Sequence, residues 1–162
     1  MRSLRSTKYE NTFIYNFNAG DKTFLSNNNM LISNVMCLLK SVFIVGIGSF
    51  VGGSLRYLIS VLMKSQANGF PFGTLCVNLL GCLLIGVFYG FAARHPLMSQ
   101  NTLLLLTTGF CGGFTTFSTF ANESLQLLQN QNIATFAVYV SASVIIGIAL
   151  VFCGYALTKL FA

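Results

Sequence analysis

The chain has 162 residues, of which 54% are hydrophobic and only 7% are charged. This composition is too apolar for a soluble domain of this size and predicts an integral membrane protein. Three acidic residues and one histidine leave few groups for acid–base catalysis or a side-chain metal cluster, so we expect no enzyme. The net charge of +6 comes from scattered Lys and Arg residues, and without a basic run we expect no nucleic-acid partner.

Residues 1–39 differ from the rest of the chain. They are polar, rich in asparagine and without a helical or strand period, which predicts a disordered N-terminal extension. No apolar core follows their basic start, so a cleavable signal peptide does not fit. Alternatively, translation starts at Met30 or Met36, and part of the extension is a misassigned reading frame.

The remainder, residues 40–162, is predicted to form one domain of four transmembrane helices. Each apolar segment is long enough to cross a hydrocarbon core of about 30 Å. The predicted helices span about 41–63, 70–93, 101–128 and 133–157. Glycines spaced by four residues, Gly48 with Gly52 and Gly86 with Gly90, favour close helix packing. The predicted fold class is therefore an all-α integral membrane protein.

The third segment contains a motif unusual for a membrane span. As one straight helix it would be about 42 Å long, which exceeds the membrane, and we expect a break at Gly112–Gly113. Backbone groups freed by a break cost several kcal/mol each in hydrocarbon, so such backbone is buried in protein, lines a cavity or holds an ion. The alternative is a glycine kink that only packs helices.

The charges near the helix ends specify the orientation only weakly. Four helices put both termini on one side of the membrane, together with Lys40, Arg94 and Lys159. Lys64 and Arg56 are the positive charges toward the other side. Because this bias is one or two charges, the positive-inside rule has little to act on. We therefore expect insertion in both orientations and an antiparallel, dual-topology homodimer.

The five cysteines show no Cys-x-x-Cys spacing, and four of them lie in apolar segments. We interpret them as small, reduced apolar residues. The alternative is a disulfide between chains through Cys37.

Two phenylalanines after the predicted break could contact an anion. Phe117 and Phe120 are three residues apart on a helix and share a face with Glu123. Phenyl edges carry partial positive charge, so they can attract an anion without a formal cation that would trap it. The nearby hydrogen-bond donors are Ser118, Thr119 and Asn78. The alternatives are that the two rings are only core and that Asn78 makes an interhelical hydrogen bond.

Four further residues have two interpretations each. Tyr139 and Ser143 lie on one stripe of the fourth helix. This stripe either forms a polar track for an ion or packs against a neighbouring helix. Arg56 is either a vestibule cation or a side chain that snorkels to a headgroup. Glu123 either accepts hydrogen bonds from Ser118 or Thr119 and orients them, or is solvated near the helix end.

Three motifs resemble those of the fluoride channels known as Fluc or CrcB, in the same order. They are Gly-Gly-Ser-Leu-Arg-Tyr at 52–57, Phe-Pro-Phe-Gly-Thr-Leu-Cys-Val-Asn-Leu-Leu-Gly at 70–81, and Gly-Phe-Cys-Gly-Gly-Phe-Thr-Thr-Phe-Ser-Thr-Phe at 109–120. The resemblance covers about residue 40 to the C-terminus. It implies a fluoride-selective channel of the bacterial inner membrane, a multi-pass homodimer in lipid that confers fluoride resistance by passive export.

The resemblance also implies roles for particular residues. Asn78, Phe117 and Phe120 correspond to residues of the fluoride path, and polar side chains at the positions of Tyr139 and Ser143 line part of it. At the break, backbone carbonyls corresponding to Gly112 and Thr115 of both subunits would hold a structural sodium ion that is not transported.

Two other functions remain as alternatives. A small dual-topology proton-coupled multidrug transporter would need an acid deep in the membrane, and the first helix contains none. A subunit of a larger complex would predict no transport by the purified protein.

Overall fold

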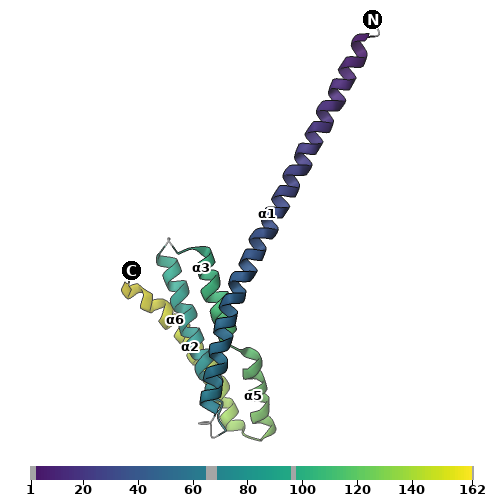
Figure 1. Cartoon of the computed structure of the whole chain (residues 1–162). Helices are drawn as coiled ribbons and strands as arrows, with labels where there is room; N and C mark the ends of the chain where they lie inside the picture. Colours follow the sequence, from purple (N-terminus) through teal and green to yellow (C-terminus); the bar gives the residue numbers. More distant parts are fainter. Residues whose placement is uncertain (1–2, 65–68, 96–97, 162) are drawn as a thin grey trace. The chain divides into compact units, whose positions relative to one another are not determined.

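The computed structural model describes residues 3–64, 69–95 and 98–161, and within these ranges helices are joined by short connections without a strand (Figure 1). The elements are α1 (Ser3–Lys64), α2 (Phe72–Arg94), α3 (Gln100–Leu104), the π-helix η1 (Leu105–Cys111), α4 (Gly112–Phe114), α5 (Phe117–Gln129), α6 (Ile133–Leu157) and the 3-10 helix η2 (Thr158–Phe161). Two compact units divide the chain, Met1–Lys40 and Ser41–Ala162.

The expectation of an all-α protein with four membrane spans is confirmed. Four helical stretches within the described residues are long and apolar enough to cross a membrane: Met30–Met63, Phe72–Arg94, Gln100–Gln129 and Ile133–Leu160. The first stretch includes Met30 to Leu39, which precede the predicted first helix and belong to the same helix α1.

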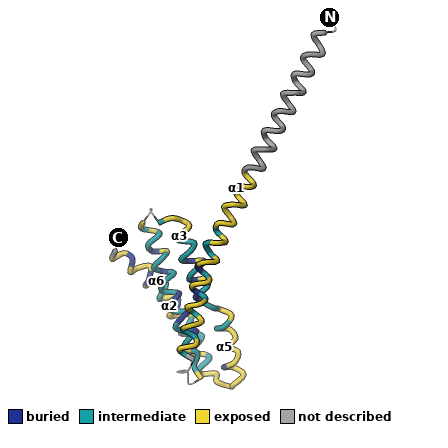
Figure 2. The backbone as a smooth tube through the Cα atoms, viewed as in Figure 1, coloured by how far each residue is buried: buried dark blue, intermediate teal, exposed yellow. Residues whose placement is uncertain are grey.

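The first unit differs from the sequence expectation in its backbone. Residues 3–40 continue α1 as helix, whereas we expected no regular structure. Side chains 30–40 are exposed along this helix (Figure 2). Disorder of the extension in solution stays a prediction.

In the second unit, α2 and α6 approach closely through glycines. A Cβ atom at Gly86 would lie 2.2 Å from the carbonyl oxygen of Val151, and one at Gly154 would lie 2.3 Å from that of Leu83. Arg94 joins the ends of the same helices, since its Nη1 donates to the carbonyl of Gly90 at 2.8 Å and to the Thr158 hydroxyl. Backbone contact at small residues is a common way of packing membrane helices.

Gly86→Val should therefore destabilise the protein by about 3 kcal/mol, because overpacking at this contact forces α2 from α6. Gly46→Val is the matched control, since a Cβ at Gly46 meets nothing within 4 Å. The midpoint of thermal unfolding in detergent, followed by circular dichroism, should fall by about 10 °C for Gly86→Val and change little for Gly46→Val. Equal shifts would show that helix propensity, not the close contact, sets the effect.

The α1 residues of the second unit pack on η1 and α4 in a similar way. A Cβ at Gly48 would lie 2.6 Å from the carbonyl oxygen of Leu105, and one at Gly52 would lie 2.2 Å from that of Phe110. From the other side, a Cβ at Gly113 would meet the Ser49 carbonyl oxygen at 2.5 Å. Gly113 is therefore required for close packing against α1.

Helical dihedral angles are interrupted two residues later than predicted. Gly112 is helical, with φ −63° and ψ −37°, and α4 continues to Phe114. The non-helical residues are Thr115, with φ −81° and ψ 157°, and Thr116, with φ −147° and ψ 118°. Neither glycine thus interrupts the helix, and Gly113 instead allows the close contact with α1, which corrects the expected position of the break.

Candidate functional site

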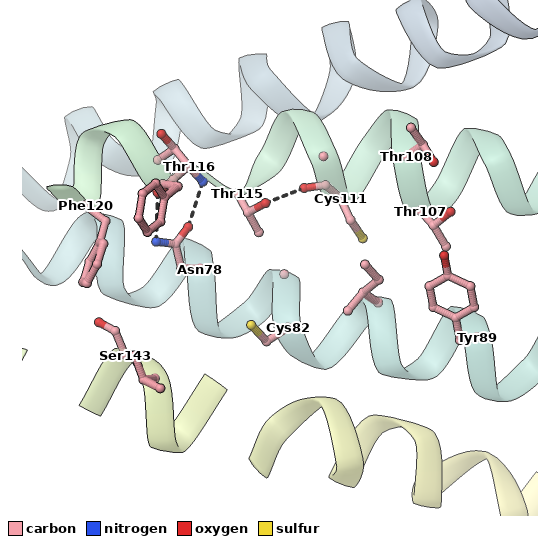
Figure 3. A pocket seen from close by; sticks show the side chains of 15 residues that line it. Asn78, Cys82, Tyr89, Thr107, Thr108, Cys111, Thr115, Thr116, Phe120 and Ser143 are labelled. Carbon is pink, nitrogen blue, oxygen red and sulfur yellow. Dashed lines mark hydrogen bonds between the residues drawn. The ribbon is translucent and has the colours of Figure 1, made fainter. Parts of the chain in front are cut away.

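A cavity of about 570 Å³ lies between α2, the η1–α5 segment and α6 (Figure 3). Six of the residues predicted for the site line it: Asn78, Gly112, Thr115, Phe117, Phe120 and Ser143. The other predicted residues, Arg56, Ser118, Thr119, Glu123 and Tyr139, are not part of its lining. No charged side chain is among the lining residues of this cavity.

Asn78 holds the non-helical segment through both atoms of its amide. Its Nδ2 donates to the Thr116 carbonyl at 3.1 Å, and its Oδ1 accepts from the Thr116 N–H at 2.8 Å (Figure 3). Because the Thr116 N–H requires an acceptor, the amide orientation is fixed, and one Nδ2 proton is left beyond this pair. The interhelical hydrogen bond considered for Asn78 is present, and the same side chain lines the cavity.

The two phenylalanines lie side by side at the start of α5, with ring centroids 5.8 Å apart. Phe117 is 80% exposed. Phe120 is half-buried and packs against Tyr139, with the two ring centroids 5.1 Å apart. Phe120 is thus packed within the chain, and Phe117 offers nearly its whole ring to the outside.

Glu123 has partners other than those expected from the sequence. Its carboxylate accepts hydrogen bonds from the Thr74 hydroxyl and the Tyr139 hydroxyl, each at 2.8 Å. Tyr139 is fully buried. Glu123 therefore anchors the tyrosine that packs against Phe120, rather than orienting Ser118 or Thr119.

The hydroxyls of Ser118 and Thr119 gather around Thr116 instead. The Thr116 Oγ1 lies 3.0 Å from Thr119 Oγ1 and 3.3 Å from Ser118 Oγ, and it accepts from the Thr119 N–H at 3.3 Å. Thr116 is thus the N-cap of α5. Sequence reasoning missed this role, although a threonine directly before a helix is a recognised capping signal.

The fourth-helix stripe is divided between two environments. Ser143 lines the cavity, but its hydroxyl donates to the Tyr139 carbonyl at 2.7 Å. Gly147 is buried, and a Cβ there would lie 3.4 Å from the sulfur of Cys82. The stripe therefore packs against α2 at one point and reaches the cavity at another.

The interruption leaves main-chain carbonyls of two cavity-lining residues without their helical hydrogen bonds. Gly112 and Thr115 both line it, and the Thr116 N–H, which would bond the Gly112 carbonyl in a continuous helix, donates to Asn78. Among the described residues, no hydrogen bond to the carbonyl of Gly112 or Thr115 is found. The same residues contain no cluster of three His, Cys, Asp or Glu side chains suited to a metal.

Sequence reasoning also missed several lining residues, which are Cys82, Tyr89, Thr107, Thr108, Cys111 and Thr116. Cys82 lies four residues after Asn78 on α2, so helical spacing could have found it. The η1 residues Thr107, Thr108 and Cys111 reach the cavity from a π-helix, whose wider turn no sequence period predicts.

The fold and cavity define a class, that of small multi-pass helical membrane proteins with an uncharged, mostly apolar cavity among their spans. Residues 43–155 match the family described as CrcB-like protein, Camphor Resistance (CrcB). The chain therefore belongs to the CrcB family, as its motifs predicted.

Relatives in this family are similar over most of the chain. The fluoride-specific ion channel FluC of Azobacteroides pseudotrichonymphae is 42% identical over 125 residues, 76% of this chain and 100% of the relative. The protein of the same name from Phocaeicola vulgatus is 47% identical over 111 residues, 68% of this chain and 91% of the relative. A third, from Clostridium perfringens, is 51% identical over 96 residues, 59% of this chain and 75% of the relative.

Proposed function

We propose that this protein is a fluoride-specific ion channel that lowers cytoplasmic fluoride by passive export, and not an enzyme. The observation that carries the proposal is the cavity in which Phe117, Phe120 and Asn78 come together beside non-helical backbone. The names of the relatives, all fluoride-specific ion channels, support it.

The chemistry of the cavity suits a small anion that must enter and leave. Bare fluoride in an apolar site would cost tens of kcal/mol, so polar donors must replace its water. The remaining Asn78 amide proton and the phenyl edges can act as donors. Since no lining side chain is charged, the binding is weak enough for release, as conduction requires.

The predicted residues outside the cavity lining have a place in this proposal. Tyr139 and Glu123 position the Phe120 ring, because their hydrogen bond fixes the tyrosine that packs against it. Ser118 is exposed and Thr119 half-buried, and both remain proposed donors along the path, with Arg56 as a nearby cation.

We infer further that the third span is discontinuous in the membrane and that two chains pair in opposite orientations. Phe117 and Gly112 line the cavity, yet both are exposed in the single chain. A second copy covering this side would enclose them. The small charge bias of the sequence permits such a dual-topology dimer, which we assign to the bacterial inner membrane.

We also propose a structural sodium ion, held by the Gly112 and Thr115 carbonyls of both chains and not transported. Carbonyl oxygens are suitable ligands for a hard cation, and these two have no hydrogen bond within the described residues. The ion would neutralise backbone charge where helical dihedral angles are interrupted.

Reconstitution tests the channel function. The purified protein in liposomes loaded with potassium fluoride should release fluoride rapidly after valinomycin, as measured with an ion electrode, and chloride-loaded liposomes should not release chloride comparably. Fluoride release at the rate of empty liposomes would refute the channel. The multidrug-transporter alternative predicts proton-coupled flux instead, but the half-buried carboxylate of Glu123 already accepts hydrogen bonds from Thr74 and Tyr139.

A further inference from the structure

Two side chains of α1 bind main-chain carbonyls of the η1–α4 segment. The Ser49 hydroxyl donates to the carbonyl of Gly109 at 3.2 Å, and the Arg56 Nε donates to that of Gly113 at 3.2 Å. The two donors are seven residues apart, on one face of α1, and Gly52 between them allows the backbones to approach. Arg56 is half-buried in this contact.

The bond to Gly113 lies at a helix end. Because α4 ends at Phe114, the carbonyls of its last turn lack their usual intrahelical donors. A helix C-terminus carries partial negative charge, which a cation stabilises. A guanidinium stays charged at any physiological pH, so Arg56 is a permanent counter-ion at this end.

The residues of this turn lie on two sides. Gly112 and Thr115 line the cavity, whereas Gly113 and Arg56 do not. Gly113 instead faces α1, since its missing Cβ would meet the Ser49 backbone. One carbonyl is thus taken by a cation of the protein itself, whereas those of the cavity-lining residues Gly112 and Thr115 accept no hydrogen bond within the described residues.

We propose that Arg56 is a positioning residue that keeps the Gly113 carbonyl out of the neighbouring cation site and restricts that site to a single positive charge. The proposal rests on the sodium site proposed above. With Arg56 present, fewer oxygens are available and the nearby charge repels a second cation, which disfavours a divalent ion more than a monovalent one. Calcium also needs six to eight oxygen ligands, which the occupied carbonyl makes harder to assemble.

The test is a cation titration of thermal stability on the full-length protein in detergent, with N-methylglucamine replaced by sodium or calcium at constant ionic strength and without fluoride. Arg56→Met removes the charge and the hydrogen bond. Arg56→Gln removes the charge but keeps an N–H donor. Arg94→Met is the matched control, because Arg94 also binds helix-end carbonyls, those of Gly90 and Tyr155, but none of its hydrogen bonds is to the η1–α4 segment.

We expect sodium, but not calcium, to raise the unfolding midpoint of the unmodified protein. Arg56→Met should unfold at lower temperature without cations, respond to sodium at about tenfold lower concentration, and gain a response to calcium. Arg94→Met should lose stability but keep the sodium concentration dependence of the unmodified protein. If Arg56→Met does not fold, the shift in sodium dependence of Arg56→Gln decides.

Two results would overturn the proposal, and they differ from each other. Arg56 variants that lose stability with an unchanged sodium dependence and no calcium response would give Arg56 a merely structural role. An unmodified protein that ignores sodium would remove the sodium site itself, while fluoride efflux from liposomes would still decide the channel function.

Discussion

Asn78→Asp should reduce fluoride efflux by about a thousandfold. A carboxylate about 4 Å from a bound anion repels it by about 4 kcal/mol at the effective dielectric constant of a protein site, and each 1.4 kcal/mol is a factor of ten. The replacement is nearly isosteric, so the Thr116 N–H keeps its acceptor. The donor toward the Thr116 carbonyl and the donor proposed for the ion are both lost.

Efflux from liposomes measures this effect, and thermal unfolding in detergent checks the fold. Asn130→Asp is the control, because it adds the same charge at an exposed residue that ends α5 and should leave efflux unchanged. Normal efflux through folded Asn78→Asp would show that Asn78 serves only to hold Thr116.

The membrane spans were predictable from the sequence because their signal is local. Length and apolar composition decide whether a segment crosses a bilayer, and the predicted helices 70–93 and 133–157 agree closely with α2 and α6. The pairs Gly48 with Gly52 and Gly86 with Gly90 also lie at close helix contacts, as their spacing predicted.

The position of the interruption was not predictable in this way, because glycine has two uses in a membrane helix. It can break the helix or let another backbone approach, and the choice depends on what lies opposite. Only the position of Ser49 against Gly113 identifies the second use. Of the two threonines that interrupt the helix, Thr116 is held by Asn78 from α2 and caps α5. The first contact is tertiary and the second is local.

The partners of Glu123 depended on long-range packing. Thr74 and Tyr139 come from α2 and α6, far from Glu123 in sequence, so spacing along α5 favoured Ser118 and Thr119 instead. The tyrosine was expected from the fourth-helix stripe, but its direction, toward Glu123 and Phe120, follows from how α5 and α6 meet.

Phe120→Ile should reduce fluoride efflux by about tenfold while the protein remains folded. The substitution keeps much of the apolar volume, so we expect a stability loss of less than about 1.5 kcal/mol. It removes the ring edge, whose partial positive charge has no equivalent in an aliphatic side chain. Loss of about 1.4 kcal/mol of stabilisation for the ion in transit corresponds to the tenfold decrease.

The geometry of Phe120 makes this substitution informative. Its ring is held on one side by Tyr139 at 5.1 Å, and Tyr139 is fixed by its hydrogen bond to Glu123. Since Tyr139 is fully buried, we expect it to restrict the orientations of the Phe120 ring, which lines the cavity. An ordered edge acts as a preformed donor, because less reorganisation is needed when the ion arrives.

Phe152→Ile is the control for a general effect of losing a phenyl ring from a membrane helix. Phe152 lies on α6, is 72% exposed and does not line the cavity, so its replacement should leave efflux unchanged. Equal efflux through Phe120→Ile, Phe152→Ile and the unmodified protein would make Phe120 a packing residue only. A selective loss at Phe120, with thermal unfolding midpoints of the two variants within a few degrees, would place the ring edge on the fluoride path.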